Sequence, residues 1–192
     1  QREVIYSQRR KVLMGENMRE HIFPMIETII QRGMDLYCDE KVYPEDWDYE
    51  DLIVYCEDYF APEGALVQAE MEKLSRQELY EHLVEVAEQA YSGRENLFGE
   101  ESMRELEKVV MLKVVDSKWM DHLDAMDMLR QGIGLRAYGQ KNPLIEYKIE
   151  AFDMFQQMIE NIQQDIVRYI FRVNLIMQPE DRLSEAQASH GK

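Results

Sequence analysis

The feature that most constrains the fold is an apolar repeat close to the end of the chain. Large apolar side chains recur there in steps of three and four: Ile145, Ile149, Phe152, Phe155, Ile159, Ile162, Ile166, Tyr169 and Val173. This spacing places them near one face of an α-helix. A helix of about 30 residues, at 1.5 Å per residue, would be about 45 Å long. The sequence therefore predicts one long amphipathic helix in this region.

A second long helix is predicted immediately before it, from Met103 to about Gln131. Residues 109–115 are apolar nearly all round, which predicts burial on several sides. Glycines and a proline then interrupt the pattern, at Gly132, Gly134, Gly139 and Pro143. Two long helices joined by a short glycine-rich segment predict an antiparallel hairpin, with its loop at about 132–142.

The first third of the chain predicts shorter helices. Residues 1–14 show helical periodicity, and Asn17 with Glu20 resembles the start of a second helix that runs towards Tyr37. Pro24 lies inside that second pattern, so we expect either a kink or a later start.

The middle of the chain carries clearer helix boundaries. One helix is expected from about Tyr49 to Tyr59, between two prolines. Ser75 and Glu78 form a capping-box pattern, which predicts a helix that begins there and ends near Gly99. Ser102 and Glu105 repeat the pattern and predict the start of the next helix. The fold class expected from these elements is all-α.

Charge limits the partners of the chain. The formal net charge is −16, and thirteen acidic residues stand between Asp35 and Glu72 against Lys41 alone. Nucleic acid is therefore not expected as a partner, because its binding depends on clustered Lys and Arg. We interpret the acidic segment 35–72 as a solvated face, with a docking site for a basic partner as the alternative. A locally basic stretch contains Arg130, Arg136, Lys141 and Lys148.

No motif for catalysis or metal binding is present. The sequence lacks G-x-x-x-x-G-K-[ST], G-x-S-x-G and H-E-x-x-H, so neither enzyme activity nor a cofactor is expected for this chain. Cys38 and Cys56 are the two cysteines, without a CxxC spacing, which predicts reduced thiols and no metal site. His122 stands near Asp121 and Asp124, and we interpret this group as a polar face opposite Trp119.

The residues from Asp116 to Tyr147 carry a resemblance to a known family. They follow the pattern D-S-x-W-x-x-H-x-x-A-M-D-x-L-R-Q-G-I-x-L-R-x-Y-x-Q-x-[ND]-P-x-x-E-Y. This long pattern closely resembles the two-helix finger of SecA protein translocase motors. Gly134 and Gly139 depart from residues common in that family and are expected to loosen the tip.

The resemblance implies a domain organisation. Residues 1–14 correspond to the end of a long scaffold helix, and residues 15–101 to a helical wing domain. Residues 102–175 correspond to the continuing scaffold with the two-helix finger, and residues 176–192 to a flexible tail. The implied fold is thus a set of long scaffold helices with an antiparallel finger and a smaller helical wing.

The resemblance also implies a function. In this family the finger couples ATP-driven motion of motor domains to the SecY channel and to an unfolded secretory preprotein. The expected contact residues are those of the finger tip: Leu135, Arg136, Ala137, Tyr138, Gly139, Gln140 and Lys141. ATP and magnesium belong to the full-length family protein, whose motor domains would be partners of this chain. The implied location is cytoplasmic, peripherally associated with the inner face of the cell membrane and its anionic surface.

The alternative is a purely structural or dimerising helical interaction module, with a second copy of the chain as its partner in a homodimer. We also expect scaffold faces around Ile5, Val12, Val110 and Val114 to be exposed in the isolated chain, which would promote self-association.

Overall fold

The computed structural model describes residues 1–15, 17–136 and 142–174 of the 192-residue chain. Within these ranges it contains α-helices, one short 3-10 helix and no strand, so the all-α prediction is confirmed. The elements are α1 (Arg2–Leu13), α2 (Met18–Tyr37), η1 (Pro44–Asp46), α3 (Tyr49–Tyr59), α4 (Gln68–Met71), α5 (Arg76–Phe98), α6 (Glu100–Arg136) and α7 (Pro143–Arg172).

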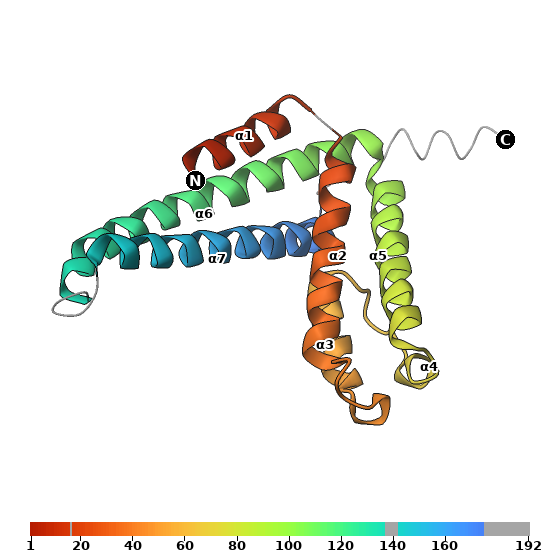
Figure 1. The fold of residues 1–192 in the computed structure, drawn as a ribbon. Helices are drawn as coiled ribbons and strands as arrows, with labels where there is room; N and C mark the ends of the chain where they lie inside the picture. Colours follow the sequence, from red (N-terminus) through yellow and green to blue (C-terminus); the bar gives the residue numbers. More distant parts are fainter. Residues whose placement is uncertain (16, 137–141, 175–192) are drawn as a thin grey trace, which may run out of the picture.

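The helices form two arms that meet at a steep angle (Figure 1). The first arm is the antiparallel pair α6 and α7, called the hairpin below, with α1 lying along α6. The second arm contains α2 to α5 (residues 18–98), called the wing below, and runs across the end of the hairpin. The far end of the hairpin therefore projects away from the wing.

Local sequence signals fix the start of two wing helices. Helix α3 spans Tyr49–Tyr59 as expected, and the Asp48 side chain accepts a hydrogen bond from the Asp51 amide at its first turn. At the start of α5, Ser75 Oγ accepts from the Glu78 amide at 3.2 Å, and Glu78 Oε2 accepts from the Ser75 amide at 2.8 Å. The predicted capping box is thus confirmed.

One expected helix start is wrong. Helix α6 begins at Glu100, so Ser102 lies inside its first turn and does not cap it. Gly99, with φ 85°, ends α5 and is the single residue between the two helices. By contrast, α2 begins at Met18, directly after Asn17, as the Asn17 and Glu20 pattern predicted. Pro24 lies within this helix and does not delay its start.

Helix α6 extends further than the glycine pattern indicated, whereas α7 begins where the loop was expected to end. Helix α6 continues beyond Gln131 through Gly132 and Gly134 to Arg136, and α7 begins at Pro143. An interior glycine costs a helix about 1 kcal/mol relative to alanine, which weakens the helix without ending it. At the start of α7, Asn142 Oδ1 accepts a hydrogen bond from the Leu144 amide at 3.0 Å.

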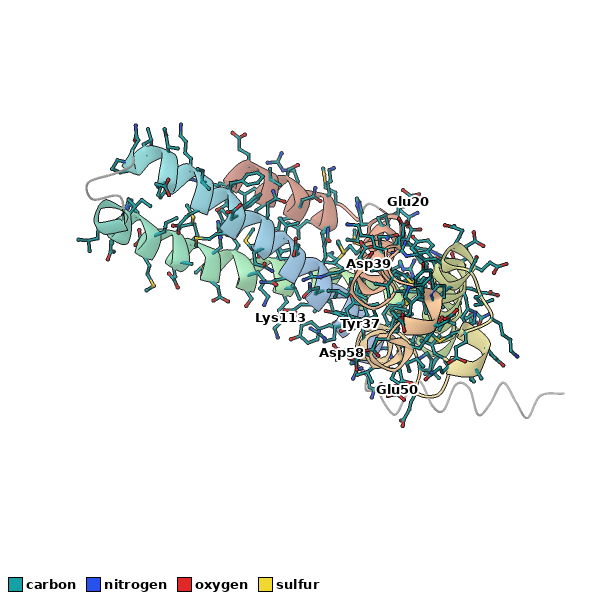
Figure 2. The ribbon with its side chains drawn as sticks, turned by 60° about the horizontal axis from the view of Figure 1, so that its bottom comes forward. Glu20, Tyr37, Asp39, Glu50, Asp58 and Lys113 are labelled. Atoms are coloured by element: carbon teal, nitrogen blue, oxygen red, sulfur yellow. The ribbon has the colours of Figure 1, made fainter. Side chains whose placement is uncertain are left out.

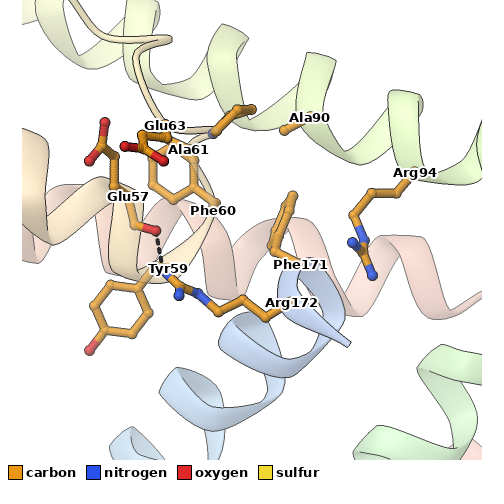
Figure 3. Close-up of a pocket in the computed structure, with 10 residues that line it drawn as sticks. Glu57, Tyr59, Phe60, Ala61, Glu63, Ala90, Arg94, Phe171 and Arg172 are labelled. Carbon is orange, nitrogen blue, oxygen red and sulfur yellow. Dashed lines mark hydrogen bonds between the residues drawn. The ribbon is translucent and has the colours of Figure 1, made fainter. Parts of the chain in front are cut away.

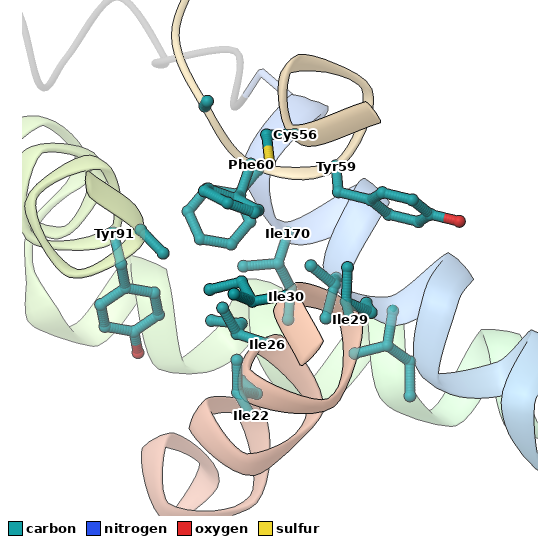
Figure 4. Close-up of a cluster of buried hydrophobic side chains, with 14 of the residues drawn as sticks. Ile22, Ile26, Ile29, Ile30, Cys56, Tyr59, Phe60, Tyr91 and Ile170 are labelled. Atoms are coloured by element: carbon teal, nitrogen blue, oxygen red, sulfur yellow. The ribbon is translucent and has the colours of Figure 1, made fainter. Parts of the chain in front are cut away.

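One apolar core joins the wing to the hairpin (Figure 4). Ile22, Ile26 and Ile30 of α2 are buried against Phe60 beside α3 and Ile170 of α7. Each fully buried side chain of this size contributes about 1.5–3 kcal/mol. The core therefore fastens the base of the hairpin to the wing.

The two cysteines belong to this core. Cys38 and Cys56 are free thiols and both are completely buried. Burial raises the pKa of Cys38 to about 11 and that of Cys56 to about 12. Both thiols are therefore protonated and unreactive near neutral pH.

Acidic side chains gather on the wing, where Asp39, Glu50 and Asp58 lie on its surface (Figure 2). Part of this charge is paired within the protein. Arg76 donates to Asp35 Oδ1 at 2.8 Å, and Arg168 of α7 donates to Asp58 Oδ2 at 2.9 Å. Since the other carboxylates are mostly exposed, the arrangement agrees with a solvated face.

Candidate functional site: the helical hairpin

The hairpin is held together by a line of buried side chains. Trp119 and Leu129 of α6 are buried, as are Ala151, Met158 and Ile162 of α7. An ion pair between Lys118 Nζ and Asp165 Oδ2, at 2.9 Å, links the two helices near the wing. At 1.5 Å per residue, the 37 residues of α6 form a rod of about 55 Å.

Helix α1 is fastened along α6. Arg9 Nε donates to Asp116 Oδ1 at 2.9 Å, and Arg9 Nη2 donates to Asp116 Oδ2 at 3.3 Å. This two-point contact raises the pKa of Arg9 through its hydrogen bond to, and its charge interaction with, Asp116. Ile5 and Val12 are buried on the same side of α1.

The expectation that the scaffold faces are exposed is therefore wrong. Ile5, Val12, Val110 and Val114 are 3–8% exposed, because helices of this chain cover them. The packing of α1 on α6 joins residues about a hundred positions apart, and nothing in the local sequence pattern revealed this contact.

His122 lies where α1 meets the hairpin. Its ring is 5% exposed, stacks on Trp119 with centroids 5.5 Å apart, and lies 5.8 Å from the ring of Phe155. Its Nε2 shares a 2.8 Å hydrogen bond with Gln1 Oε1, and Gln1 Nε2 donates to the carbonyl of Ala151 at 3.2 Å. Burial lowers the pKa of His122.

The interpretation of His122 as part of a polar face was consequently wrong. The imidazole lies on the same side as Trp119, in a seam shared by α1, α6 and α7. Gln1 directly precedes α1, and its side chain bridges both hairpin helices. Here too the relevant partner is distant in sequence.

The apolar repeat of α7 divides into a packed half and an exposed half. Ile162 and Ile166 are buried against the rest of the protein, whereas Ile145, Ile149 and Phe152 are 55%, 52% and 61% exposed. In the distal half, the buried position on α7 is Ala151, on a neighbouring face of the helix. An apolar face of α7 is therefore left uncovered away from the wing.

The residues predicted for polypeptide contact lie at the tip of the hairpin, between the end of α6 and the start of α7 or within the last residues of α6. Leu135, near the end of α6, is 84% exposed. Arg136 is the last residue of α6. The other predicted residues, Ala137, Tyr138, Gly139, Gln140 and Lys141, lie outside the residues that the structure describes.

Basic and apolar residues mix on the distal hairpin. Met128 and Leu144 are exposed, as are Arg130 and Lys148. Arg130 donates to Asp127 Oδ1 at 2.9 Å within the same helix, an exposed pair that contributes little to stability. The distal hairpin thus presents apolar area together with charges of both signs, since Asp121, Asp124 and Asp127 of α6 are exposed as well.

Two hollows lie at the base of the hairpin. One, of about 470 Å³, opens between α6 and α7 beside Val109, Lys113 and Tyr169. The other, also about 470 Å³, opens where α3, α5 and the end of α7 meet (Figure 3). In the second hollow, Arg172 donates to the carbonyl of Glu57 and Arg94 to that of Val173, so both guanidinium groups are bound to the backbone.

Sequence reasoning also missed a buried polar cluster between the wing and the hairpin. Glu107 of α6 is completely buried, and the hydroxyl of Tyr91 in α5 donates to its Oε1. The signal was weak: a glutamate within an otherwise apolar stretch of α6.

No metal-binding arrangement of His, Cys, Asp and Glu side chains occurs in the part of the chain that the structure describes. Over the same residues, none of the helices combines the length and apolar character needed to cross a membrane.

Comparison with known proteins places these features in a family. The family described as SecA Wing and Scaffold domain matches residues 1–174. The chain is 53% identical over 184 residues to the protein translocase subunit SecA of Pelotomaculum thermopropionicum, covering 96% of this chain and 21% of that protein. It is 53% identical over 182 residues to the SecA subunit of Desulforamulus reducens, covering 95% of this chain and 21% of that protein. The chain thus spans about a fifth of the length of these curated relatives.

Proposed function

Since the chain belongs to the wing and scaffold family of the protein translocase subunit SecA, we propose that its hairpin is a two-helix finger. In this proposal, the finger couples ATP-driven motion of motor domains to the SecY channel and to an unfolded secretory preprotein. The observation that carries it is a rod anchored at one end and uncovered at the other. The base of the hairpin is buried against the wing, whereas Leu135 near the tip is 84% exposed.

The anchoring of the hairpin supports a mechanical role. A displacement applied to α1 reaches α6 through the two-point Arg9–Asp116 contact and through the seam of Gln1 and His122. Packed helices transmit displacement because protein interiors have low compressibility. The motor domains would act on the hairpin through this route.

The chemistry of the tip supports contact with a polypeptide of varied sequence. Leu135 offers apolar area, and Tyr138 adds an aromatic ring with one polar group, a combination that grips a chain without reading its sequence. The positive charges of Arg130 and Lys148 suit an approach to an anionic membrane surface. In this proposal, the site of action is the cytoplasmic side of the membrane.

The enzyme activity of the proposed motor resides elsewhere. The sequence contains no P-loop motif, so we expect no ATP turnover by this chain alone. ATP and magnesium would be bound by other domains of a full-length SecA.

The test uses a full-length SecA in which this chain replaces the matching segment. Tyr138→Ala should lower the rate of preprotein import into SecY-containing vesicles by about tenfold, equivalent to about 1.4 kcal/mol of lost contact. The matched control is Tyr43→Ala, since Tyr43 is exposed on the wing, far from the hairpin tip. Equal import by the Tyr138→Ala protein and the unmodified chimera would contradict the proposal.

A dimerising helical module is the second candidate, favoured by the uncovered face of Ile145, Ile149 and Phe152. Sedimentation equilibrium of the chain at increasing concentration separates the two. A tight dimer that dissociates in Phe152→Ser would support the module, whereas a monomer at all concentrations would exclude it.

A further inference from the structure

The junction between the wing and the hairpin contains a buried ionic cluster. The Tyr91 hydroxyl donates to Glu107 Oε1, and Arg104 Nη2 donates to the same hydroxyl at 2.8 Å. Arg104 Nη2 also donates to Glu95 Oε2, and Arg104 Nε lies 3.1 Å from Glu107 Oε2. The cluster therefore ties α5 of the wing to α6 of the hairpin.

Helices α2 and α7 also contact the ring of Tyr91. From α2, the guanidinium of Arg19 lies over the Tyr91 ring, 5.4 Å from its centroid. From α7, the ring of Phe171 meets it edge-on, with centroids 6.4 Å apart. Helices α2, α6 and α7 thus all contact Tyr91 of α5, whose hydroxyl holds Glu107.

Glycines stand in both covalent connections between the wing and the rest of the protein, where they allow changes in backbone torsion. Gly99 alone separates α5 from α6, and Gly15 lies between α1 and α2. Both have positive φ, 85° and 71°, and no atom lies within 4 Å of where a Cβ would stand on either. Backbone torsion at these two turns can therefore change with little steric resistance.

Space for such a change is present beside both the first turn and the cluster. A cavity of about 560 Å³ is lined by Gly15 and Met18 at the start of the wing and by Arg104 of α6. Glu100, which directly follows Gly99, lines the same cavity. The hinge residues and the ionic cluster are thus adjacent in space.

Burying a carboxylate in a protein core costs free energy, because the charged group loses its hydration. Apolar residues of similar volume often give equal or greater stability than a buried ion pair, whereas directional hydrogen bonds select one arrangement. The apolar core shared by α2 and α7 supplies attraction between the arms, but its contacts lack this directionality.

We infer that Glu107, Tyr91 and Arg104 form a latch that fixes the angle between the wing and the hairpin. When the latch is open, the wing turns about Gly15 and Gly99 while the apolar core keeps it attached. This inference goes beyond the proposed function, because it concerns the angle between the two arms and requires no contact between the hairpin and a polypeptide.

Distance measurement between spin labels on the two arms tests the latch in the 192-residue chain. The labelled positions are Val54→Cys on the wing and Met128→Cys on the hairpin, both exposed in the structure. The native cysteines are completely buried, so the label reacts at the introduced sites. The unmodified latch should give one narrow distance distribution.

Glu107→Leu keeps the volume of the side chain and removes the acceptor of the Tyr91 hydroxyl. We expect a second, shifted distance population while helix content and cooperative unfolding are retained. Glu107→Gln keeps an acceptor for Tyr91 and should largely preserve the single distance. A single narrow distribution in folded Glu107→Leu would overturn the inference.

Two further variants keep the test decisive. Met103→Ala creates a cavity one turn from Glu107 without touching the polar cluster, since Met103 is also completely buried. If Met103→Ala splits the distribution as Glu107→Leu does, general loosening replaces the latch as the explanation. If Glu107→Leu does not fold, Tyr91→Phe removes the hydroxyl alone, and a single narrow distance in that variant would overturn the inference.

Discussion

Replacing glycine by alanine should change the free energy of unfolding in opposite directions at Gly33 of α2 and Gly93 of α5. The difference arises where α2 crosses α3. A Cβ added at Gly33 would lie 2.6 Å from Tyr55 Cε1 and 2.8 Å from Tyr55 Cδ1. The Tyr55 ring is restrained, because its hydroxyl donates to the Ile29 carbonyl at 2.8 Å and its ring packs 4.9 Å from that of Tyr59. Alanine at position 33 must therefore displace a rigid, anchored ring.

The magnitude follows from two opposing effects. Overpacking of this kind costs about 1–3 kcal/mol. Replacing an interior helical glycine by alanine returns about 1 kcal/mol. Gly33→Ala should thus lower the free energy of unfolding by about 1 kcal/mol, the middle of the range that remains.

The matched control is Gly93→Ala. Gly93 lies inside α5, and no atom stands within 4 Å of the position of an added Cβ. Only the helix propensity changes there, so this variant should gain about 1 kcal/mol. Urea unfolding followed by far-ultraviolet circular dichroism measures both. Equal stabilities, or a more stable Gly33→Ala protein, would refute the packing argument.

Three other predictions concern a helix start, a buried imidazole and the hairpin end. Ser75→Ala removes the acceptor of the Glu78 amide and should cost about 1 kcal/mol, measured by urea unfolding. Folding lowers the pKa of His122 from its ordinary value of 6.5. As pH falls below 6.5, the unfolded chain therefore takes up a proton at this residue before the folded protein does. The contribution of His122 to the free energy of unfolding is complete above pH 6.5 and is lost as pH falls through the folded pKa. His122→Gln should reduce the dependence of the free energy of unfolding on pH in this range. An unchanged pH dependence in this variant would contradict the assignment. Gly134→Ala, with open space around it, should slow amide hydrogen exchange near the end of α6; unchanged exchange rates would count against this.

Short-range patterns were sufficient for the type and start of several elements. The helix at Tyr49–Tyr59 and the capping box at Ser75 depend on residues within one helical turn, so their signals are present in the local sequence. The same signals failed at Ser102, because Gly99 had already ended one helix and the next began at once.

Contacts between distant residues could not be predicted in this way. The pairing of Arg9 with Asp116 and of Gln1 with His122 depends on how α1 lies against the hairpin. The predicted exposure of Ile5 and Val12 failed for the same reason, since a periodic pattern identifies an apolar face but not the element that covers it.

The sequence by itself determined the helical class, the long amphipathic hairpin helices and the family resemblance carried by Asp116 to Tyr147. Each of these depends on residue types at fixed spacings along the chain. Only the tertiary structure decided that Ile162 is buried while Phe152 is exposed, although both belong to one apolar repeat. It also decided that Glu107 closes a cluster between two arms. Burial and ionic pairing depend on which helices meet in space, and the one-dimensional pattern does not contain that information.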